Sequence, residues 1–466
     1  MTKNDIITLR IDGYASSGDG VAHHEGRAVF VRRSLEGELI SARILKVTNA
    51  AVFAKVEELL EASTERTEPE CVNFGKCGGC ALMHMSYAEE LHYKHSRVSD
   101  ALRRIGGVDI ELPPVEPSHD ILRYRNKAIF EVGFENGAPV TGFYRERSHD
   151  IVTVSDCLLQ SQAANCVAET VKGWMEQYAV ADGLIRYLFC RTAADGGVQI
   201  VIVASRRKLY ETQSLIDELR ERVLELRGVL ICVNNSSGNV VLTDDIRVIY
   251  GDECLTDVLC GHEFSLSPQS FYQVNHTQAE QLYACAVTFA ALGKDDRAVE
   301  LYCGAGTITL ALARTAGFVY GIELVPEAVL NAEKNAAKNG VTNVEFILGD
   351  AGETALTLAK SGIMPTVVVV DPPRKGLSPD GIEAIVKMSP QRVVYVSCDP
   401  ATLARDVKLL GADGYSVAKV RAFDMFPRCA HVETVVVLTK DKNQEAKNIY
   451  FKTDENSKPI WKDTYE

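Results

Sequence analysis

The sequence contains no hydrophobic run long enough to cross a membrane. Its longest uncharged, largely apolar stretch covers residues 301–313, which are 13 residues interrupted by two glycines, whereas a spanning helix needs about 20. The N-terminal sequence MTKNDIITLR is charged and includes no apolar core of the kind found in secretion signals. We therefore expect a cytoplasmic protein with no membrane partner.

Positive charge is also in short supply, because 50 lysines and arginines face 63 aspartates and glutamates, which gives a formal net charge of −13. Taken alone, this balance argues against a nucleic-acid partner. Net charge does not describe a local groove, however, and residues 1–60 are neutral while short basic clusters follow them. RNA therefore stays open as a partner.

Neither disorder nor a disulfide scaffold fits the composition. Hydrophobic residues make up 46% of the chain and charged residues 24%, as in ordinary globular proteins. The 13 cysteines are an odd number in a chain without an export signal, so most of them should be reduced and packed in the core. The length of 466 residues predicts about three domains, and nothing in the sequence requires more than a monomer.

Three regions of different pattern follow one another along the chain. Residues 1–60 contain short apolar runs bounded by glycine, serine and asparagine, which indicates a small OB-like β-barrel. Such barrels often bind oligonucleotides, although a packing role is the alternative. A polar linker opens a β-rich central domain over residues 61–265, and residues 441–466 form a polar tail.

Residues 266–440 alternate between strands and helices. Continuous valine and isoleucine runs separated by helical patterns predict a mostly parallel sheet covered on both faces, as in a Rossmann-like α/β domain. The last two strands have only a short connection and should form an antiparallel pair. The expected strands cover residues 298–303, 318–324, 344–350, 366–371, 392–398, 415–423 and 433–440.

A nucleotide-type cofactor site is predicted where the first of these strands turns into a helix. Gly304 and Gly306 allow a tight turn and a close approach of the ligand to the backbone. Glu323 follows 19 positions after Gly304, at the end of the next strand, where a carboxylate usually holds a ribose diol. The dinucleotide fingerprint would place a third glycine at the position of Thr309, so NAD is disfavoured.

Further carboxylates follow other strands of the same sheet. Asp350 and Asp371 each come at a strand end, and the carboxyl ends of parallel strands line one crevice. Several carboxylates suit a cationic sulfonium better than an anionic dinucleotide. The sequence thus favours S-adenosylmethionine as the cofactor.

Candidate reactive residues lie in the same region. The motif that begins at Asp371 reads DPPR, and its Arg374 replaces the aromatic residue found in amino-group methyltransferases. Cys398 follows the next strand and precedes a helix, a position expected to stabilise its thiolate. Glu433 opens the last strand; a solvated strand end is the alternative interpretation, and spacing does not prove that it pairs with Cys398.

Two further groups of residues suggest binding sites. Cys71, Cys77 and Cys80 have a C-x5-C-x2-C spacing, which suits either zinc or an iron–sulfur cluster with a fourth ligand elsewhere. The segment LRYRNK joins an aromatic ring to three cations, which suits splayed single-stranded RNA, although a solvated face is the alternative. Its predicted RNA-binding residues are Arg123, Arg125 and Lys127.

Taken together, these segments resemble the bacterial RNA uracil-5 methyltransferase family, which includes 23S rRNA enzymes and the tRNA T-loop enzyme. Residues 1–60 are similar to the TRAM module, a small RNA-binding barrel. The matching motifs of the catalytic domain are SPQSFYQVN (267–275), LYCGAGTITL (301–310), DPPRKGL (371–377), SCDPATLARD (397–406) and HVETV (431–435).

The resemblance implies a mechanism. The thiolate of Cys398 adds to C6 of a flipped uridine, so that C5 can attack the activated methyl group. Glu433 then removes the C5 proton as a general base. One departure from the family is Cys429, which stands where threonine is frequent. The residues implied to line the S-adenosylmethionine site are Gln273, Tyr302, Gly304, Gly306, Thr307, Glu323, Asp350 and Asp371.

The resemblance also names a [4Fe–4S] cluster and supplies Cys157 as its fourth ligand, a choice that spacing alone does not make over Cys166. A cluster together with a TRAM-like barrel favours 23S rRNA as the substrate over tRNA. A tRNA T-loop uridine-5 methyltransferase is one alternative. A non-catalytic RNA-binding iron–sulfur protein is another, but it predicts the loss of Cys398 or Glu433, and both are present.

Overall fold

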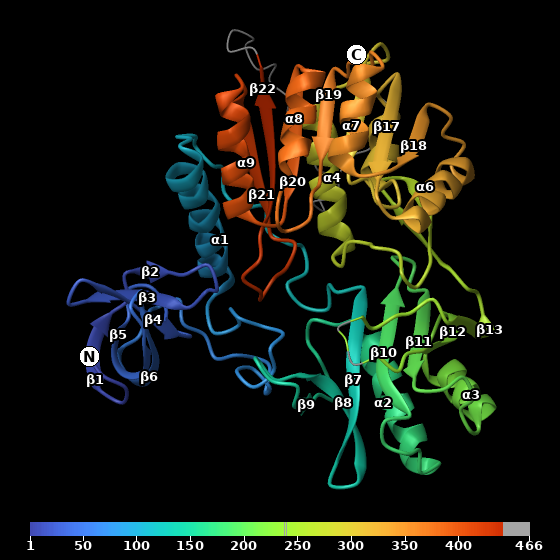
Figure 1. Cartoon of the computed structure of the whole chain (residues 1–466). Helices are drawn as coiled ribbons and strands as arrows, with labels where there is room; N and C mark the ends of the chain where they lie inside the picture. The colour runs from blue at the N-terminus through green and yellow to red at the C-terminus, as the bar shows by residue number, and fades with distance from the viewer. Residues whose placement is uncertain (237, 239, 441–466) are drawn as a thin grey trace.

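The computed structural model describes residues 1–236, 238 and 240–440, and Figure 1 shows its three large β-sheets. The polar tail expected over residues 441–466 lies outside the described residues. Within the described part of the chain, no helix is long and apolar enough to cross a membrane.

The N-terminal region forms the predicted β-barrel-like module. Its sheet has the order β1-β5-β6-β4-β3-β2. Alternate residues of β5 face inward and bury Ile40, Ala42 and Ile44 in a small core, as a half-buried strand requires. Its strands are β1 (Ile6–Arg10), β2 (Gly13–Tyr14), β3 (Gly20–His24), β4 (Arg27–Arg32), β5 (Leu39–Val47) and β6 (Val52–Glu61).

The central sheet has seven strands in the order β13-β12-β11-β10-β7-β8-β9. Two helices, α2 (Gln162–Gln177) and α3 (Thr212–Arg222), pack apolar side chains against one face. Phe189 and Tyr187 lie on the other face, in a smaller apolar cluster. The strands are β7 (Lys127–Glu135), β8 (Ala138–Tyr144), β9 (Ile151–Thr153), β10 (Ile185–Thr192), β11 (Val198–Ala204), β12 (Leu226–Val233) and β13 (Ile246–Gly251).

The catalytic sheet also has seven strands, and its order is β18-β17-β16-β19-β20-β22-β21. The pairs from β18 to β20 are parallel, whereas β22 is antiparallel to both β20 and β21, which confirms the predicted antiparallel pair. The strands are β16 (Arg297–Leu301), β17 (Phe318–Glu323), β18 (Val344–Leu348), β19 (Val367–Val370), β20 (Arg392–Ser397), β21 (Ser416–Phe423) and β22 (Glu433–Thr439).

The strand order determines where the predicted ligand crevice lies. The chain leaves β16 toward β17 on one side and later toward β19 on the other, so a ligand site is expected at the carboxyl ends of β16 and β19. In Figure 1, β22 points away from the central sheet; because β20 is antiparallel to it, the carboxyl ends of the parallel strands face the central sheet. The crevice therefore opens between the two large domains.

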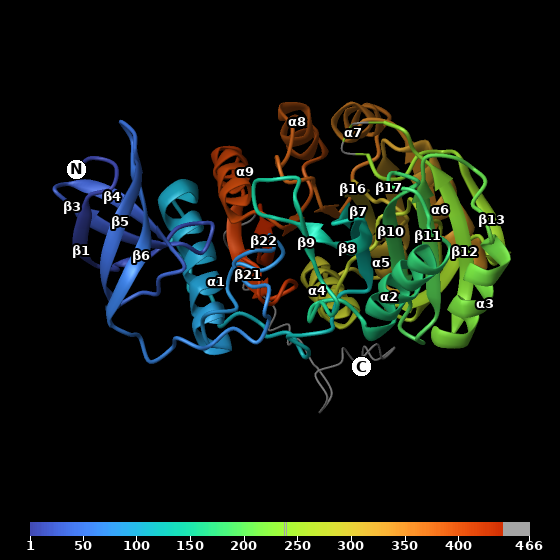
Figure 2. The same cartoon turned by 90° about the horizontal axis from the view of Figure 1, so that it is seen from below.

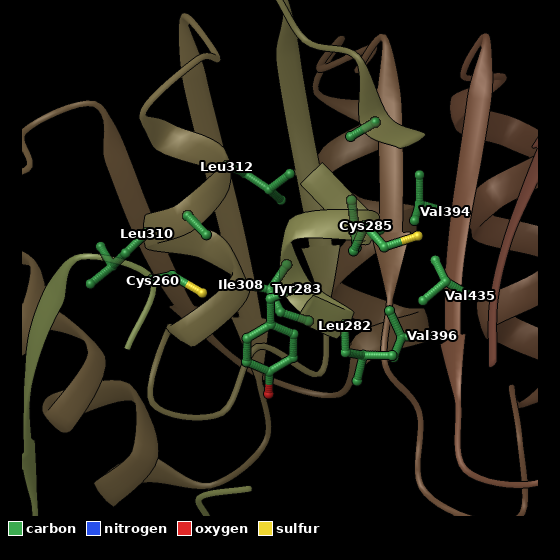
Figure 3. Close-up of a cluster of buried hydrophobic side chains, with 14 of the residues drawn as sticks. Cys260, Leu282, Tyr283, Cys285, Ile308, Leu310, Leu312, Val394, Val396 and Val435 are labelled. Carbon is green, nitrogen blue, oxygen red and sulfur yellow. The ribbon is translucent and has the colours of Figure 1, made fainter. Parts of the chain in front are cut away.

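Helices cover both faces of the catalytic sheet. Figure 3 shows part of the core, where Cys285 from α4 lies near Val394 of β20 and Val435 of β22. A hairpin of β14 (Leu255–Leu259) and β15 (His262–Leu266) joins this core. The helices are α4 (His276–Ala290), α5 (Thr307–Ala313), α6 (Pro326–Lys338), α7 (Ala351–Lys360), α8 (Pro379–Met388) and α9 (Pro400–Ala412).

Helix α1 (Tyr87–Ala101) lies in the region 61–265, which the sequence analysis assigned to the central domain. In the structure it packs against the catalytic sheet. It continues into a π-helical turn, η1 (Leu102–Gly106), and buries Val98 and Leu102 in the core beneath β20 and α9. Both views show α1 between the barrel and α9 (Figures 1 and 2). The helix therefore connects the barrel to the catalytic domain.

Candidate active site

The loop after β16 is shaped by left-handed backbone. Gly304 and Gly306 have φ angles of +54° and +83°, and a Cβ atom on Gly306 would approach the Phe346 ring to 3.0 Å. The amide of Gly304 donates to Glu323 Oε2 over 3.0 Å, and Glu323 Oε1 accepts from the amide of Val325 over 2.9 Å. The carboxylate predicted to receive a ribose is thus held rigidly beside the glycine turn.

Thr309, which stands where the dinucleotide fingerprint has its third glycine, makes a hydrogen bond of its own. Its hydroxyl donates to a carboxylate oxygen of Glu300, a buried residue of β16. Burial raises the pKa of Glu300 to about 8, and Asp371 and Glu323 add to this effect. Sequence analysis missed Glu300 because a glutamate inside a strand pattern gives no signal that it faces the helix carrying Thr309.

Asp350 stands at the end of β18 and caps α7. Its Oδ1 accepts from the amides of Gly352 at 3.0 Å and Glu353 at 3.2 Å. Tyr302 has a φ of +67°, which is unusual for a residue with a side chain, and its hydroxyl bonds to Ser378. Both predicted residues therefore lie on the rim of the crevice, with their orientation set by neighbouring loops.

Three predicted cofactor residues meet around a tyrosine that sequence analysis did not select. The buried hydroxyl of Tyr283, in α4, bonds to the side chains of Thr307 and Gln273. Burial and the nearby Asp371 carboxylate raise its pKa well above the usual range. Figure 3 shows this hydroxyl at the edge of the apolar cluster. The only sequence signal was its place in the helix that follows the motif containing Gln273.

Cys398 lies just after β20 and is partly buried. Burial raises the pKa of its thiol to about 11, with further contributions from Glu433 and Asp371, while Arg374 lowers it. The expected stabilisation of the thiolate by the following helix is wrong for this structure. The reason is that burial outweighs any favourable effect of the helix N-terminus, which Asp399 caps by accepting from the amides of Ala401 at 2.9 Å and Thr402 at 3.0 Å.

Glu433 and Asp371 share this environment. Glu433 is only 4% exposed, so it is not a solvated strand end. Burial raises its pKa to about 8, Asp371 raises it further and Arg374 opposes the shift. Burial also raises the pKa of Asp371 to about 7. The structure thus gathers a thiol, two carboxyl groups and Arg374, which sequence analysis had treated only as a missing aromatic.

The four predicted cysteine ligands line one cavity of about 90 Å³. Burial and the neighbouring thiols raise the pKa of both Cys77 and Cys80. Cys71 and Cys157 border the same cavity, whereas Cys166 donates to the carbonyl of Arg222 over 3.4 Å. Between residues 1 and 440, excluding 237 and 239, no group of three or more histidine, cysteine, aspartate or glutamate side chains has the arrangement of a metal-ion site.

The three predicted RNA-binding cations have different surroundings. Arg123 is paired with Asp156 at 2.6 Å and donates to the carbonyl of Cys157 at 2.8 Å, so it also braces the loop that carries Cys157. Arg125 borders the cysteine cavity. Burial and the neighbouring Arg191 and Arg125 lower the pKa of Lys127 to about 8.

Comparisons with known proteins agree with this geometry. Residues 86–441 match the sequence model of the tRNA (Uracil-5-)-methyltransferase family, and residues 2–56 match that of the TRAM domain. An RNA methyltransferase from Clostridium tetani is 39% identical over 94% of this chain and 97% of its own length. One from Halalkalibacterium halodurans is 38% identical over 94% of this chain and 98% of its own length.

A solved structure matches as well. The tRNA (uracil-54, C5)-methyltransferase of Pyrococcus abyssi, in complex with S-adenosyl-L-homocysteine, has a TM-score of 0.74 and 25% identity, and covers 93% of this chain and 100% of its own. RNA is therefore the partner, and the prediction from net charge that a nucleic-acid partner is disfavoured is wrong. From these matches and the crevice at the carboxyl edge of its sheet, the chain belongs to the S-adenosylmethionine-dependent RNA uracil-5 methyltransferase family and carries a TRAM domain at its N-terminus.

Proposed function

We propose that this protein transfers a methyl group from S-adenosylmethionine to C5 of a specific uridine in 23S rRNA. The observation that carries the proposed chemistry is the meeting of Cys398, Glu433, Asp371 and Arg374 at the carboxyl edge of the sheet that also holds the glycine turn. A nucleophile and a base on neighbouring strands are what C5 methylation requires. The TRAM domain supplies an RNA-binding surface.

In the first step, the Cys398 thiolate forms a bond to C6, and the electron pair of the C5–C6 double bond moves to give an enolate. C5 then attacks the methyl carbon, whose bond to the sulfonium breaks. With a thiol pKa of about 11, Cys398 is protonated in the resting state at neutral pH, and its proton is released to solvent before the thiolate adds to C6. Arg374, the cation that lowers the pKa of this thiol, stabilises the developing thiolate.

In the second step, the methylated ring still carries the C5 proton. Glu433 takes this proton, the C5–H electron pair restores the double bond, and Cys398 leaves C6 as a thiolate. Because Glu433 has a pKa of about 8, its charged form rises steeply in abundance between pH 7 and 9. Uridine must leave the base stack to reach these groups.

The cofactor residues have separable roles. Glu323, which is held by the amides of Gly304 and Val325, accepts the ribose hydroxyls. Asp350 and Tyr302 border the place expected for the adenosine. Gln273 and Thr307, joined through Tyr283, face the sulfonium end next to Asp371, whose charge suits a cationic centre.

We further propose that Cys71, Cys77, Cys80 and Cys157 hold a [4Fe–4S] cluster, which supplies a rigid covalent crosslink between the cysteine loop and the central domain when bound. The four thiols fit this group, because they border one cavity with apolar walls that include Phe143.

The RNA path includes an aromatic pair on the TRAM domain. The rings of Phe30 and Phe53 stack with centroids 5.6 Å apart, and Phe53 is 43% exposed. Two positions further along the same strands, Arg32 pairs with Lys55 on the same side of the sheet, and Arg32 also bonds to Glu146 at 2.6 Å. An exposed ring, backed by a half-buried one and flanked by cations, suits stacking of unpaired bases, and we place Arg125 and Lys127 further along the path toward the crevice.

A tRNA T-loop substrate is a second candidate function, because the Pyrococcus abyssi tRNA enzyme matches 93% of this chain. Domain content alone therefore separates the two substrates poorly. The deciding experiment offers 23S rRNA and tRNA transcripts separately with labelled S-adenosylmethionine and maps any 5-methyluridine. The proposal expects label in the rRNA, and label confined to the tRNA would replace the substrate while keeping the chemistry.

A further inference from the structure

The segment Asp424–Ala430 connects β21 to β22 and leads directly to Glu433. Asp424 is fully buried, and its amide donates to the carbonyl of Glu116 over 2.9 Å. Arg428, near the other end, has a φ of +67°, a conformation that surrounding contacts must hold in place. Glu433, the first residue of β22, pairs with Phe423 of β21, so this segment closes the loop whose two ends hold the base in the sheet.

A buried lysine on α1 holds the beginning of the segment. Lys94 Nζ donates to Asp424 Oδ1 over 2.5 Å and to the carbonyl of Phe426 over 3.1 Å. It also donates to Glu90 Oε1 over 2.6 Å. All three ammonium protons therefore have acceptors, and the side chains of Lys94, Glu90 and Asp424 are 0% exposed.

The same network reaches the end of the segment. Glu90 Oε1 accepts from the amide of Arg428 over 2.7 Å, and its Oε2 lies 3.5 Å from the Arg428 guanidinium. Two carboxylates thus face two cations, and all four side chains are buried. Removing one partner from such a set leaves an uncompensated buried charge, so the loss of Lys94 should displace the carboxylates that it binds.

The cysteine loop contacts the segment from its other side. The amide of Ala81 donates to the carbonyl of Arg428 over 2.9 Å, and Cys429 Sγ donates to the carbonyl of Gly79 over 3.3 Å. These contacts support the segment but do not reach Asp424. Lys94 therefore holds the start of the segment together with the carbonyl of Glu116, which accepts from the Asp424 amide.

We propose that Lys94 is a positioning residue for proton abstraction: by binding Asp424 and Phe426 it fixes the segment that places Glu433 against C5. This role rests on the proposed function, because only uracil C5 methylation leaves a proton on the methylated carbon. The nucleophile Cys398 comes from β20, a different strand. A displaced segment should therefore impair the base while leaving addition and methyl transfer in place.

The reaction offers a readout that general loss of stability does not reproduce. When Glu433 fails to remove the C5 proton, the C6–S bond is not broken, and the methylated RNA stays attached to Cys398. An enzyme with a misplaced base should accumulate this adduct, with label from S-adenosylmethionine, as a slow band on a denaturing gel.

The test compares Lys94→Met with the unchanged full-length protein, using the RNA that the unchanged protein methylates. We expect turnover to fall about 100-fold, the loss typical of a misplaced catalytic group, with unchanged RNA affinity and a labelled adduct. The matched control is Lys387→Met, which breaks an exposed i,i+4 pair with Glu383 of the same kind as Lys94–Glu90. This control should keep full turnover and show no adduct.

Asp424→Asn provides the same test if Lys94→Met does not fold, because it weakens the contact but keeps the shape of the side chain. Normal turnover in a folded variant, or lost turnover without the labelled adduct, would overturn the role of Lys94. Absence of 5-methyluridine with the unchanged protein would instead overturn the proposed function. The two failures are therefore separated by the same gel and nucleoside analysis.

Discussion

The pH dependence of product release tests the environment of Glu433 directly. Its pKa of about 8 means that about one-tenth of the carboxyl groups are ionised at pH 7 and about nine-tenths at pH 9. If the charged form removes the C5 proton, the rate of this step should rise roughly tenfold across this range. A glutamate with its usual pKa near 4.5 would give no such rise.

The assay must isolate this step from the ionisation of Cys398, whose thiol has a pKa of about 11. We would form the methylated adduct at pH 6, where Glu433 is protonated, and then jump to a series of higher pH values. The thiol has already reacted at that point, so the decay of the labelled adduct reports on the base alone. A rate that is constant from pH 7 to 9 would refute the reasoning.

Arg374 provides a second check on the same assay. Its charge lowers the pKa of Glu433, so Arg374→Gln should move the rise in the decay rate to higher pH. The side chain is exposed, which makes a folding defect an improbable cause of the change. A profile that moves to lower pH would contradict the assigned contact.

Three further predictions concern stability, RNA binding and the cysteines. The pKa of Glu300 rises from a usual value of 4.5 to about 8 on folding, so the folded state binds the proton more tightly than the unfolded state. As the pH rises from 4.5 to 8, the free energy of unfolding should therefore fall by up to about 1.4 kcal/mol per pH unit. Urea denaturation of Glu300→Gln should show a weaker pH dependence in this range. Replacing Phe30 and Phe53 by alanine should reduce RNA affinity by about 10-fold or more in filter binding, as expected for a lost stacking contact. Cys77→Ser should lower the iron content of anaerobically purified protein, whereas Cys166→Ser should not.

Each of these predictions has an outcome that contradicts it. An unchanged pH dependence of unfolding would show that Glu300 does not titrate as its burial implies. Tyr210→Ala removes a ring that is 66% exposed on the central domain; an equal loss of RNA affinity in this control would mean that the TRAM pair has no special role. Equal iron in both cysteine variants would remove the argument for the cavity ligands.

The architecture of the catalytic domain could be predicted from sequence because its signals are local. A continuous run of β-branched residues, such as residues 366–370, is typical of a strand that is covered on both faces of its sheet. The observed strand covers Val367–Val370. The carboxyl ends of such strands meet by geometry, so Glu323 and Asp371 were expected in one crevice. The position of α1 did not follow, because an amphipathic helix does not encode which surface it covers.

The environment of the reactive groups depends on contacts between distant segments. Tyr283 and Glu300 bond to residues that lie 24 and 9 positions away along the chain, and neither belongs to a recognisable motif. The raised pKa of Cys398 arises from burial and from carboxyl groups on other strands. The local sequence around Cys398 indicates only the helix that follows it, and neither the burial of the thiol nor the approach of these carboxyl groups is encoded there.

The central claim is methyl transfer to uridine C5 through a thioether at Cys398. The most direct measurement combines this protein, labelled S-adenosylmethionine and 23S rRNA transcript, followed by nucleoside analysis and a denaturing gel. We expect labelled 5-methyluridine with the unchanged protein, a labelled covalent adduct with Glu433→Gln, and neither product with Cys398→Ala. Formation of 5-methyluridine by Cys398→Ala would contradict the mechanism.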